Sequence, residues 1–244
     1  MNAALIMSKV EVTRVFRNKR YLIFTLALPV MMYMIFGKTT GQMTGANMEV
    51  KVYYMISMAT LGAFSGALMG SAVRISTERK SGWTRQLRLT AMPGWAYVVA
   101  KIAAALCTTI PSVVIVLLLG KVYGGVSLDA AWKWAALAVV IWIGSSIFAA
   151  LSVAIGYRMD PEAVQPATML VYLPMILLGG IYFFPSGWLG KVASALPTWQ
   201  LHQVSGQIIA EGSVPMNGVL IILAWGAAFT FLAAIAFRTS NKDG

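Results

Sequence analysis

Six long apolar segments determine what this chain can fold into. They cover approximately Tyr21–Gly37, Val52–Val73, Trp95–Leu119, Trp132–Gly156, Ala167–Phe184 and Met216–Phe237. A helix needs about 20 mostly apolar residues to cross a hydrocarbon core about 30 Å thick, and the first segment is short by this measure. With only 11% charged residues, the chain lacks the polar surface of a soluble domain. The sequence therefore predicts an all-α polytopic membrane protein, a single domain over residues 1–244.

The distribution of Lys and Arg predicts the orientation of these spans. With the N-terminus in the cytoplasm, thirteen basic residues flank the spans on the inside and five on the outside. Basic residues concentrate on the cytoplasmic side of membrane proteins, so we expect both termini to be cytoplasmic. Lys101 lies near the cytoplasmic start of the third span, where we expect it to extend to the headgroups. The net charge of +11 is then mainly a topology signal, and nucleic-acid binding is the weaker explanation.

Two segments outside the spans have their own patterns. Residues 1–20 mix apolar and charged residues at roughly helical spacing, which favours an amphipathic helix on the inner leaflet over a plain basic flank. The first span ends without a small-residue cleavage pattern, so we expect it to be retained. The stretch 185–212 is too polar and too rich in Gly and Pro to span the membrane, although it could dip into it.

The predicted spans lack the residues that ion-driven transport and catalysis use. None of the eight acidic residues falls within them, His202 lies in an outer loop, and Cys107 is the single cysteine. Ionisable groups within a membrane usually mark ion pathways, so a proton-coupled carrier is less favoured. A resemblance of FGKTT to the end of a phosphate-binding loop fails, because Met32 occupies the position of the first glycine. We expect no catalytic site, metal or cofactor in the chain itself.

The second span contains three glycines four residues apart, Gly62, Gly66 and Gly70. Glycines at this spacing open a groove that lets another helix backbone approach closely. The approaching helix belongs either to the same subunit or to a second copy, and the sequence leaves both alternatives open.

One dense charged segment, RISTERKSGWTRQLRLTAMP, separates the second and third spans. Gly82 permits a sharp bend, and after it Trp83 and Leu87 share one face of a short helix. Arg85 and Arg88 point elsewhere. A helix with one aromatic and aliphatic face flanked by basic residues is suited to dock into a cleft on another protein. The same residues are also suited to contact lipid headgroups. Composition alone leaves these alternatives equal.

Two stretches resemble the ABC-2 type permeases, in particular their daunorubicin-resistance-like branch of drug and antibiotic exporters. The residues ERKSGWTRQLRLTAMP, from Glu78 to Pro93, are similar to the family segment E-R-x-x-G-x-x-R-x-L-R-x-T-P-x. The residues LLGGIYFFPSGWLGKVASALPTWQL resemble the stretch that forms short helices re-entering the outer leaflet before the last span. This chain departs from the family in its displaced proline, Pro93, and in Gly179, where a serine is usual.

The resemblance implies a coupling helix over 77–91 that contacts a separate ATPase. Its residues are Glu78, Arg79, Gly82, Trp83, Arg85, Leu87 and Arg88. It also implies re-entrant helices over 185–212, and a complex of two permease chains, identical or homologous, with two ATPase subunits that bind ATP and Mg. Such a complex in a bacterial inner membrane exports an apolar or amphipathic drug, antibiotic or lipid-like substrate, as in multidrug efflux and antibiotic resistance.

Flexible and aromatic side chains in the first and fifth spans suit the lining of a path for such a substrate. They are Met31, Met32, Tyr33, Phe36, Tyr172, Met175, Tyr182 and Phe183. For any single one of them contact with lipid or a neighbouring helix is the favoured alternative, so the path is predicted for the set and not for its individual members. The alternative functions are an ion-driven carrier or passive channel that needs no ATPase, and a membrane-embedded scaffold that binds a soluble partner.

Overall fold

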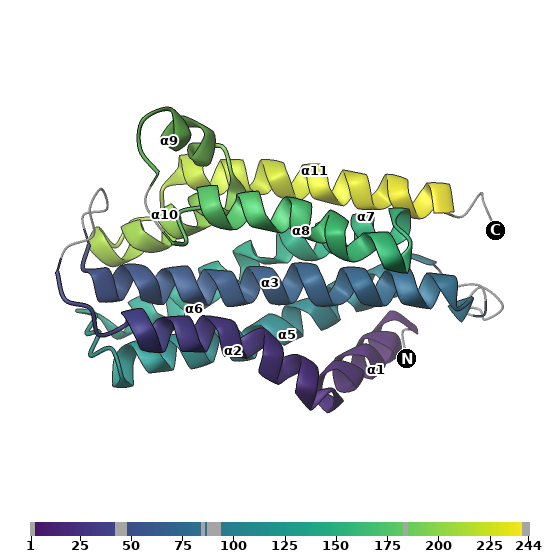
Figure 1. The fold of residues 1–244 in the computed structure, drawn as a ribbon, viewed down its shortest axis with the longest axis horizontal. Coiled ribbons are helices and arrows are strands. Elements are labelled where there is room, and N and C mark those ends of the chain that lie inside the picture. The colour runs from purple at the N-terminus through teal and green to yellow at the C-terminus, as the bar shows by residue number, and fades with distance from the viewer. Residues whose placement is uncertain (1–2, 42–47, 84–85, 87–93, 183–184, 241–244) are drawn as a thin grey trace.

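The computed structural model describes residues 3–41, 48–83, 86, 94–182 and 185–240. These residues form a bundle of helices (Figure 1). In chain order the helices are α1 (Ala3–Arg17), α2 (Lys19–Phe36), α3 (Val50–Lys80), α5 (Gly94–Val122), α6 (Ala131–Gly144), α7 (Ser146–Arg158), α8 (Pro161–Leu178), α9 (Gly187–Ser194), α10 (Pro197–Ala210) and α11 (Met216–Ser240).

The predicted set of membrane spans corresponds to long apolar helices. Five segments of the described chain are long and apolar enough to cross a membrane: α3, most of α5, α6 with α7, α8, and most of α11. The pair α1 and α2 is bent by 77°, and counting it as one further span gives up to six. The multi-pass, all-helical fold is therefore confirmed for the described residues. The short first segment is the one that does not qualify alone.

The fifth span is shifted toward the N-terminus from its expected position at Ala167–Phe184. Helix α8 begins at Pro161, because proline at the first helical position already has a helical φ and needs no N–H partner. It ends at Leu178, before Gly179 and Gly180. Gly180 has φ 70°, a left-handed conformation that favours glycine and stops the helix. Beyond it, α9 and α10 occupy the region expected to be re-entrant, 185–212.

Helix α3 runs through the centre of the bundle (Figure 1), with buried residues from Val52 to Glu78. Its three spaced glycines contact helices of the same chain. A Cβ on Gly62 would overlap Ser112 of α5, and one on Gly70 would overlap Tyr21 of α2. A Cβ on Gly66 would lie 3.6 Å from the nearest side-chain atoms of both α2 and α5, an ordinary contact distance. In this structure the glycine ladder therefore packs α3 against α2 and α5 of its own subunit.

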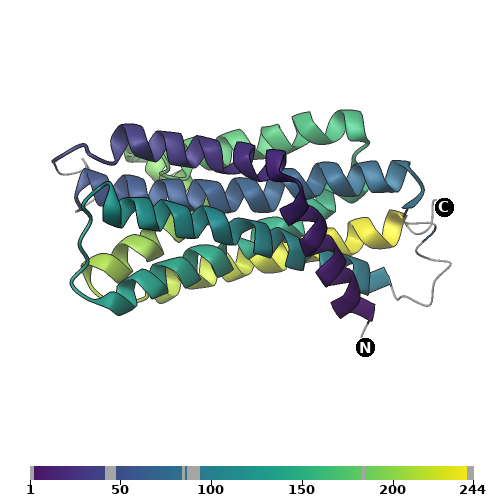
Figure 2. The ribbon, with the colours of Figure 1, turned by 90° about the horizontal axis from the view of Figure 1, so that it is seen from below.

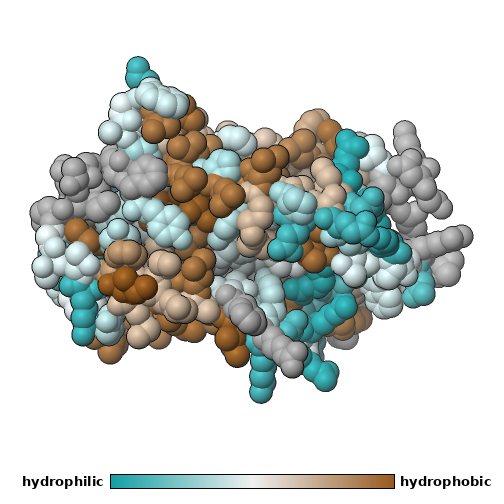
Figure 3. Space-filling model, viewed as in Figure 1, coloured by the Kyte–Doolittle hydropathy of each residue, from teal (hydrophilic) through white to brown (hydrophobic). Residues whose placement is uncertain are grey.

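Both chain termini lie at the same end of the bundle (Figures 1 and 2), called here the N/C end. Helix α3 also ends there, and α1 crosses the bundle obliquely beside it (Figure 2). Hydrophilic side chains gather at the N/C end, whereas the middle of the bundle is covered by hydrophobic ones (Figure 3). This division is the one expected of a membrane protein, with an apolar belt in the middle and polar side chains beyond it.

Candidate functional site

The candidate site is the end of α3, where the membrane-spanning helix leads into the charged segment. Helix α3 continues from its expected end at Val73 to Lys80, so Thr77–Lys80 forms its last turn and no separate helix begins at Thr77. The backbone turns at Gly82, where φ is 74°. Trp83 follows with 40% of its surface exposed. Of the other residues assigned to the coupling helix, Arg85, Leu87 and Arg88 lie outside the described part of the chain.

Glu78 joins three helices at this point. Its carboxylate accepts from Arg14 of α1 at 2.7 Å, lies 2.7 Å from the Lys101 ammonium of α5, and accepts from the Tyr97 hydroxyl at 2.6 Å. Glu78 is only 5% exposed. A buried carboxylate requires such charged and hydrogen-bonding partners, because burial removes its hydration.

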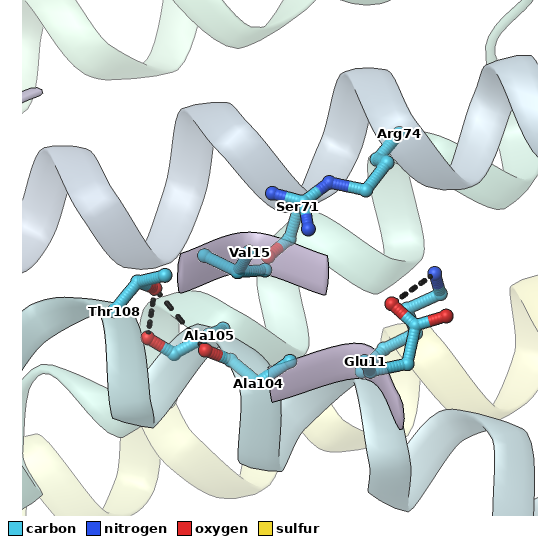
Figure 4. A pocket seen from close by; sticks show the side chains of 8 residues that line it. Glu11, Val15, Ser71, Arg74, Ala104, Ala105 and Thr108 are labelled. Atoms are coloured by element: carbon cyan, nitrogen blue, oxygen red, sulfur yellow. Dashed lines mark hydrogen bonds and ion pairs between the residues drawn. The ribbon is translucent and has the colours of Figure 1, made fainter. Parts of the chain in front are cut away.

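Lys101 contacts a second buried carboxylate, that of Glu11 on α1, at 2.9 Å. Lys101 and Glu11 are 3% and 1% exposed. The expectation that Lys101 extends to the headgroups is therefore wrong. Helix α1 lies beside α5, and this places Glu11 next to the ammonium (Figure 4). Glu11, Arg14, Glu78, Tyr97 and Lys101 are called here the Glu78 cluster.

The absence of acidic residues from the apolar segments does not keep every acidic residue out of the protein interior. The acids do lie outside the apolar segments in sequence, yet folding buries two of them beside a lysine. A small space between Glu11, Ser71, Lys101 and Thr108 has no room for a water molecule (Figure 4). The two carboxylates of the Glu78 cluster are balanced by two cations, and three of these four charged groups are buried while Arg14 is exposed, which suits a structural junction at the edge of the bundle.

The other side of the α3 end is bound to the junction of α7 and α8. Arg79 pairs with Asp160 at 3.0 Å and donates hydrogen bonds to the carbonyl oxygens of Tyr157 and Met159. Lys80 pairs with Glu162 at 2.6 Å, and this pair is largely exposed. Exposed pairs contribute little, about 0–1 kcal/mol each. The end of α3 is therefore fixed mainly by the Glu78 cluster and by the contacts of Arg79.

The residues expected to line a substrate path are distributed over several environments. Tyr33, Tyr172 and Met175 lie in the hydrophobic core. Met31 is 59% exposed on α2, and Phe36 stacks on Tyr54. Of the remaining three, Met32 and Tyr182 are partly buried and Phe183 lies outside the described residues. Their assignment to a path stays a prediction.

A buried polar contact at the opposite end was not predicted. His202, which the sequence places in an outer loop, lies on α10 with its Nε2 atom 2.9 Å from the Ser57 hydroxyl of α3. Tyr53 donates to the Gly180 carbonyl at 2.5 Å. Burial lowers the pKa of His202 to about 4, so the ring is neutral. A single sequence does not show this pairing, because 145 residues separate the two side chains.

The apolar helical bundle, with one charged end, defines a multi-pass membrane protein. Residues 2–199 match the family model of the ABC-2 type transporter. The chain belongs to the ABC-2 type transporter family and is a membrane permease component of a transporter. It is similar to the Bacillus subtilis (strain 168) protein named "Putative transport permease YvfS", with 23% identity over 236 residues, which cover 96% of each chain. The family implies association with an ABC ATPase.

Proposed function

We propose that this chain is the membrane subunit of an ATP-driven exporter that moves an apolar or amphipathic substrate out of the cell. A separately encoded ATPase binds ATP and Mg and supplies the work. The complex has two permease chains and two ATPase subunits in a bacterial inner membrane, with both permease termini in the cytoplasm. Membership of the ABC-2 type transporter family supports the partnership with an ATPase.

The observation that carries the proposal is the rigid connection of the α3 end to the rest of the bundle. The last turn of α3 is bonded to α1 and α5 through Glu78, and to the α7–α8 junction through Arg79. Immediately beyond that turn the chain bends and exposes Trp83. A force on the segment after Gly82 therefore moves α3 together with these neighbours, since closely packed helices shift as bodies.

In this mechanism Trp83 is the docking residue that inserts into a groove of the ATPase. A large exposed aromatic side chain is the kind of residue that dominates the energy of such interfaces. Arg79 and Glu78 are positioning residues, because they fix the direction in which α3 leaves the membrane.

Replacing Trp83 by Ala tests the proposal in proteoliposomes that contain the chain and its ATPase. We expect substrate-stimulated, vanadate-sensitive ATP hydrolysis to fall at least about tenfold, as for loss of a central interface residue. Trp188→Ala is the matched control, because Trp188 is 72% exposed on α9 near the opposite end of the bundle (Figure 1). Unchanged hydrolysis and export in Trp83→Ala, or an equal loss in Trp188→Ala, would contradict the assigned coupling role.

Ion-driven transport has one structural observation in its favour, the burial of Glu11 and Glu78. Buried carboxylates often carry protons in ion-coupled carriers. Here both are paired with Lys101, and the space beside Glu11 and Lys101 has no room for water, which disfavours rapid protonation of Glu11. Uphill transport by the purified chain alone, driven by a proton gradient and abolished by an uncoupler, would establish the carrier and refute the ATPase-driven exporter.

A further inference from the structure

A groove of about 400 Å³ lies between α2, α3 and α8 in the half of the bundle near the N/C end. Its wall includes Tyr21 of α2, Met69, Val73 and Arg74 of α3, and Thr168 of α8. This volume is within the range of sites that bind drug-sized molecules, about 300–1,000 Å³. None of the Glu78 cluster residues lines the groove. Arg74 lines both the groove and the small space beside Glu11 and Lys101, so it lies between the groove and the Glu78 cluster.

Arg74 differs from the other partly or fully buried basic residues in the described part of the chain. Lys51, Arg79, Lys101 and Lys133 each form an ion pair with a carboxylate. Within the same described residues Arg74 forms no ion pair and no hydrogen bond. Its guanidinium carbon lies 5.5 Å from the centroid of the Tyr21 ring.

The guanidinium of Arg74 extends back along α3 toward Ser71, away from the N/C end (Figure 4). An arginine that serves only to mark the membrane face would extend toward the headgroups instead. A charge placed inward is costly, and such residues usually contact a substrate or an ion. Arg74 lines both the groove and the small space shown in Figure 4, and its five N–H donors have no carboxylate partner among the described residues.

The groove has a polar end and an apolar end. Asn18, Thr77 and Gln165 lie on its wall close to the helix ends at the N/C end. Met69 precedes Thr77 by eight residues, which is about 12 Å along a helix of 1.5 Å rise per residue. With Val73 and the Tyr21 ring, Met69 makes the deeper part apolar. Arg74 lies between the two parts, and no acidic residue lines the groove.

We propose that this groove binds an anionic amphiphile, a molecule with a phosphate or carboxylate head and a hydrocarbon tail. The head is bound by Arg74, whose planar guanidinium matches the oxygens of such a group, and Asn18, Thr77 and Gln165 supply further polar contacts. The tail lies along Met69 and Val73. The inference extends the proposed exporter function, because it gives the substrate a negative charge, but binding itself needs no ATPase.

The binding experiment uses the full chain in nanodiscs with trace amounts of photoreactive phosphatidylglycerol or phosphatidylcholine that carry identical acyl chains. We expect wild-type protein to crosslink phosphatidylglycerol about tenfold more than phosphatidylcholine, because one charge-assisted contact favours the anionic lipid by about that factor. Adducts should map to α2, α3 and α8 around Met69, Val73 and Thr168. Arg74→Gln should abolish the preference and Arg74→Lys should retain most of it. Arg158→Gln, which removes an exposed charge at the same end, should leave it unchanged.

Equal crosslinking of the two lipids by wild-type protein, or adducts only outside the groove, overturns the proposal even if Arg74→Gln fails to fold. A preference that persists in folded Arg74→Gln overturns it as well. These outcomes leave the ATPase-driven exporter intact, because no ATPase is present in this experiment.

A second measurement identifies the source of the bound molecule. Proteoliposomes with the ATPase and fluorescent phosphatidylglycerol report movement between leaflets by dithionite quenching. ATP-dependent movement that is lost in Arg74→Gln supports the groove as a substrate site for anionic lipids. If the anionic lipid crosslinks to the groove but is not moved between leaflets, the groove is the site of a resident bilayer lipid. If anionic lipid binds in the groove but Trp83→Ala leaves export unchanged, the coupling role of Trp83 is contradicted. The proposal that the groove binds an anionic amphiphile is then still supported.

Discussion

Lys101 illustrates how a single residue acquires a role that its sequence position conceals. In the sequence it is a lysine at the edge of an apolar segment. In the fold its ammonium lies between Glu11 and Glu78, at 2.9 and 2.7 Å, and is almost fully buried. Removing one partner of a buried ion pair is costly, because the remaining charge keeps its desolvation penalty without compensation.

Substitution of Lys101 by Met is therefore expected to destabilise the protein by about 3–5 kcal/mol, since the buried Glu11 carboxylate loses the ammonium it pairs with, while Glu78 keeps Arg14 and Tyr97. The measurement is the thermal unfolding midpoint of the purified chain in nanodiscs. Lys191→Met removes an exposed lysine of α9 and serves as the control, with an expected change within about 0.5 kcal/mol. An equal shift in both variants would show that the Glu78 cluster contributes no specific stability.

At the scale of elements, the close approach of α3 to α7 depends on Gly156. A Cβ at this position would lie 2.8 Å from both the Ala72 carbonyl oxygen and the Ile75 Cβ of α3. Neither atom is the flexible end of a side chain, so the helices themselves would have to separate. Helix α3 carries Arg79 and α7 carries its partner Tyr157, and the spacing of the two helices therefore affects the geometry of the α3 end.

Gly156→Ala is expected to lower stability by about 1–3 kcal/mol through this overpacking. Gly66→Ala is the matched control, because the added Cβ would lie 3.6 Å from its nearest neighbours, an ordinary contact distance. The control should be neutral or stabilising by up to about 1 kcal/mol, since Ala favours a helix over Gly. The comparison of unfolding midpoints checks the prediction, and a larger loss in Gly66→Ala would contradict the packing described here.

For the whole molecule, the apolar middle corresponds to the membrane, and the N/C end and the opposite end of the bundle are its two faces. The orientation of these faces follows from the bias of Lys and Arg. Residues Arg158 and Lys191 are exposed, the first at the N/C end and the second on α9 near the other end (Figure 1). They offer a direct test of which face is cytoplasmic.

In a Cys107→Ser background, a membrane-impermeant maleimide added to intact cells should label Lys191→Cys and spare Arg158→Cys. Permeabilisation should then expose Arg158→Cys to the reagent. The positive-inside bias predicts this pattern because translocation of basic segments is disfavoured. Labelling of Arg158→Cys in intact cells would show that the N/C end faces outward. That result would contradict the proposed topology and the proposed position of the ATPase.

Much of the architecture could be predicted because apolar length is a local property. The helices at Met216–Ser240, Gly94–Val122 and Ala131–Arg158 lie within a few residues of the predicted spans. The predicted positions of helix ends were less accurate. Glu78 was assigned to a separate coupling helix, whereas α3 extends to Lys80, since polar residues beyond the membrane can continue a helix that tertiary contacts support.

The amino-acid sequence is sufficient to predict a bundle of membrane helices with most of its basic residues on one side, and its motifs indicate the family. Helix packing brings Lys101 between Glu11 and Glu78, places His202 beside Ser57, and leaves Arg74 at a groove without a carboxylate partner among the described residues. The difference arises because hydrophobic length acts within one segment. Pairing of charges and polar groups depends instead on how helices far apart in the chain pack, and a single sequence carries no periodic signal for that packing.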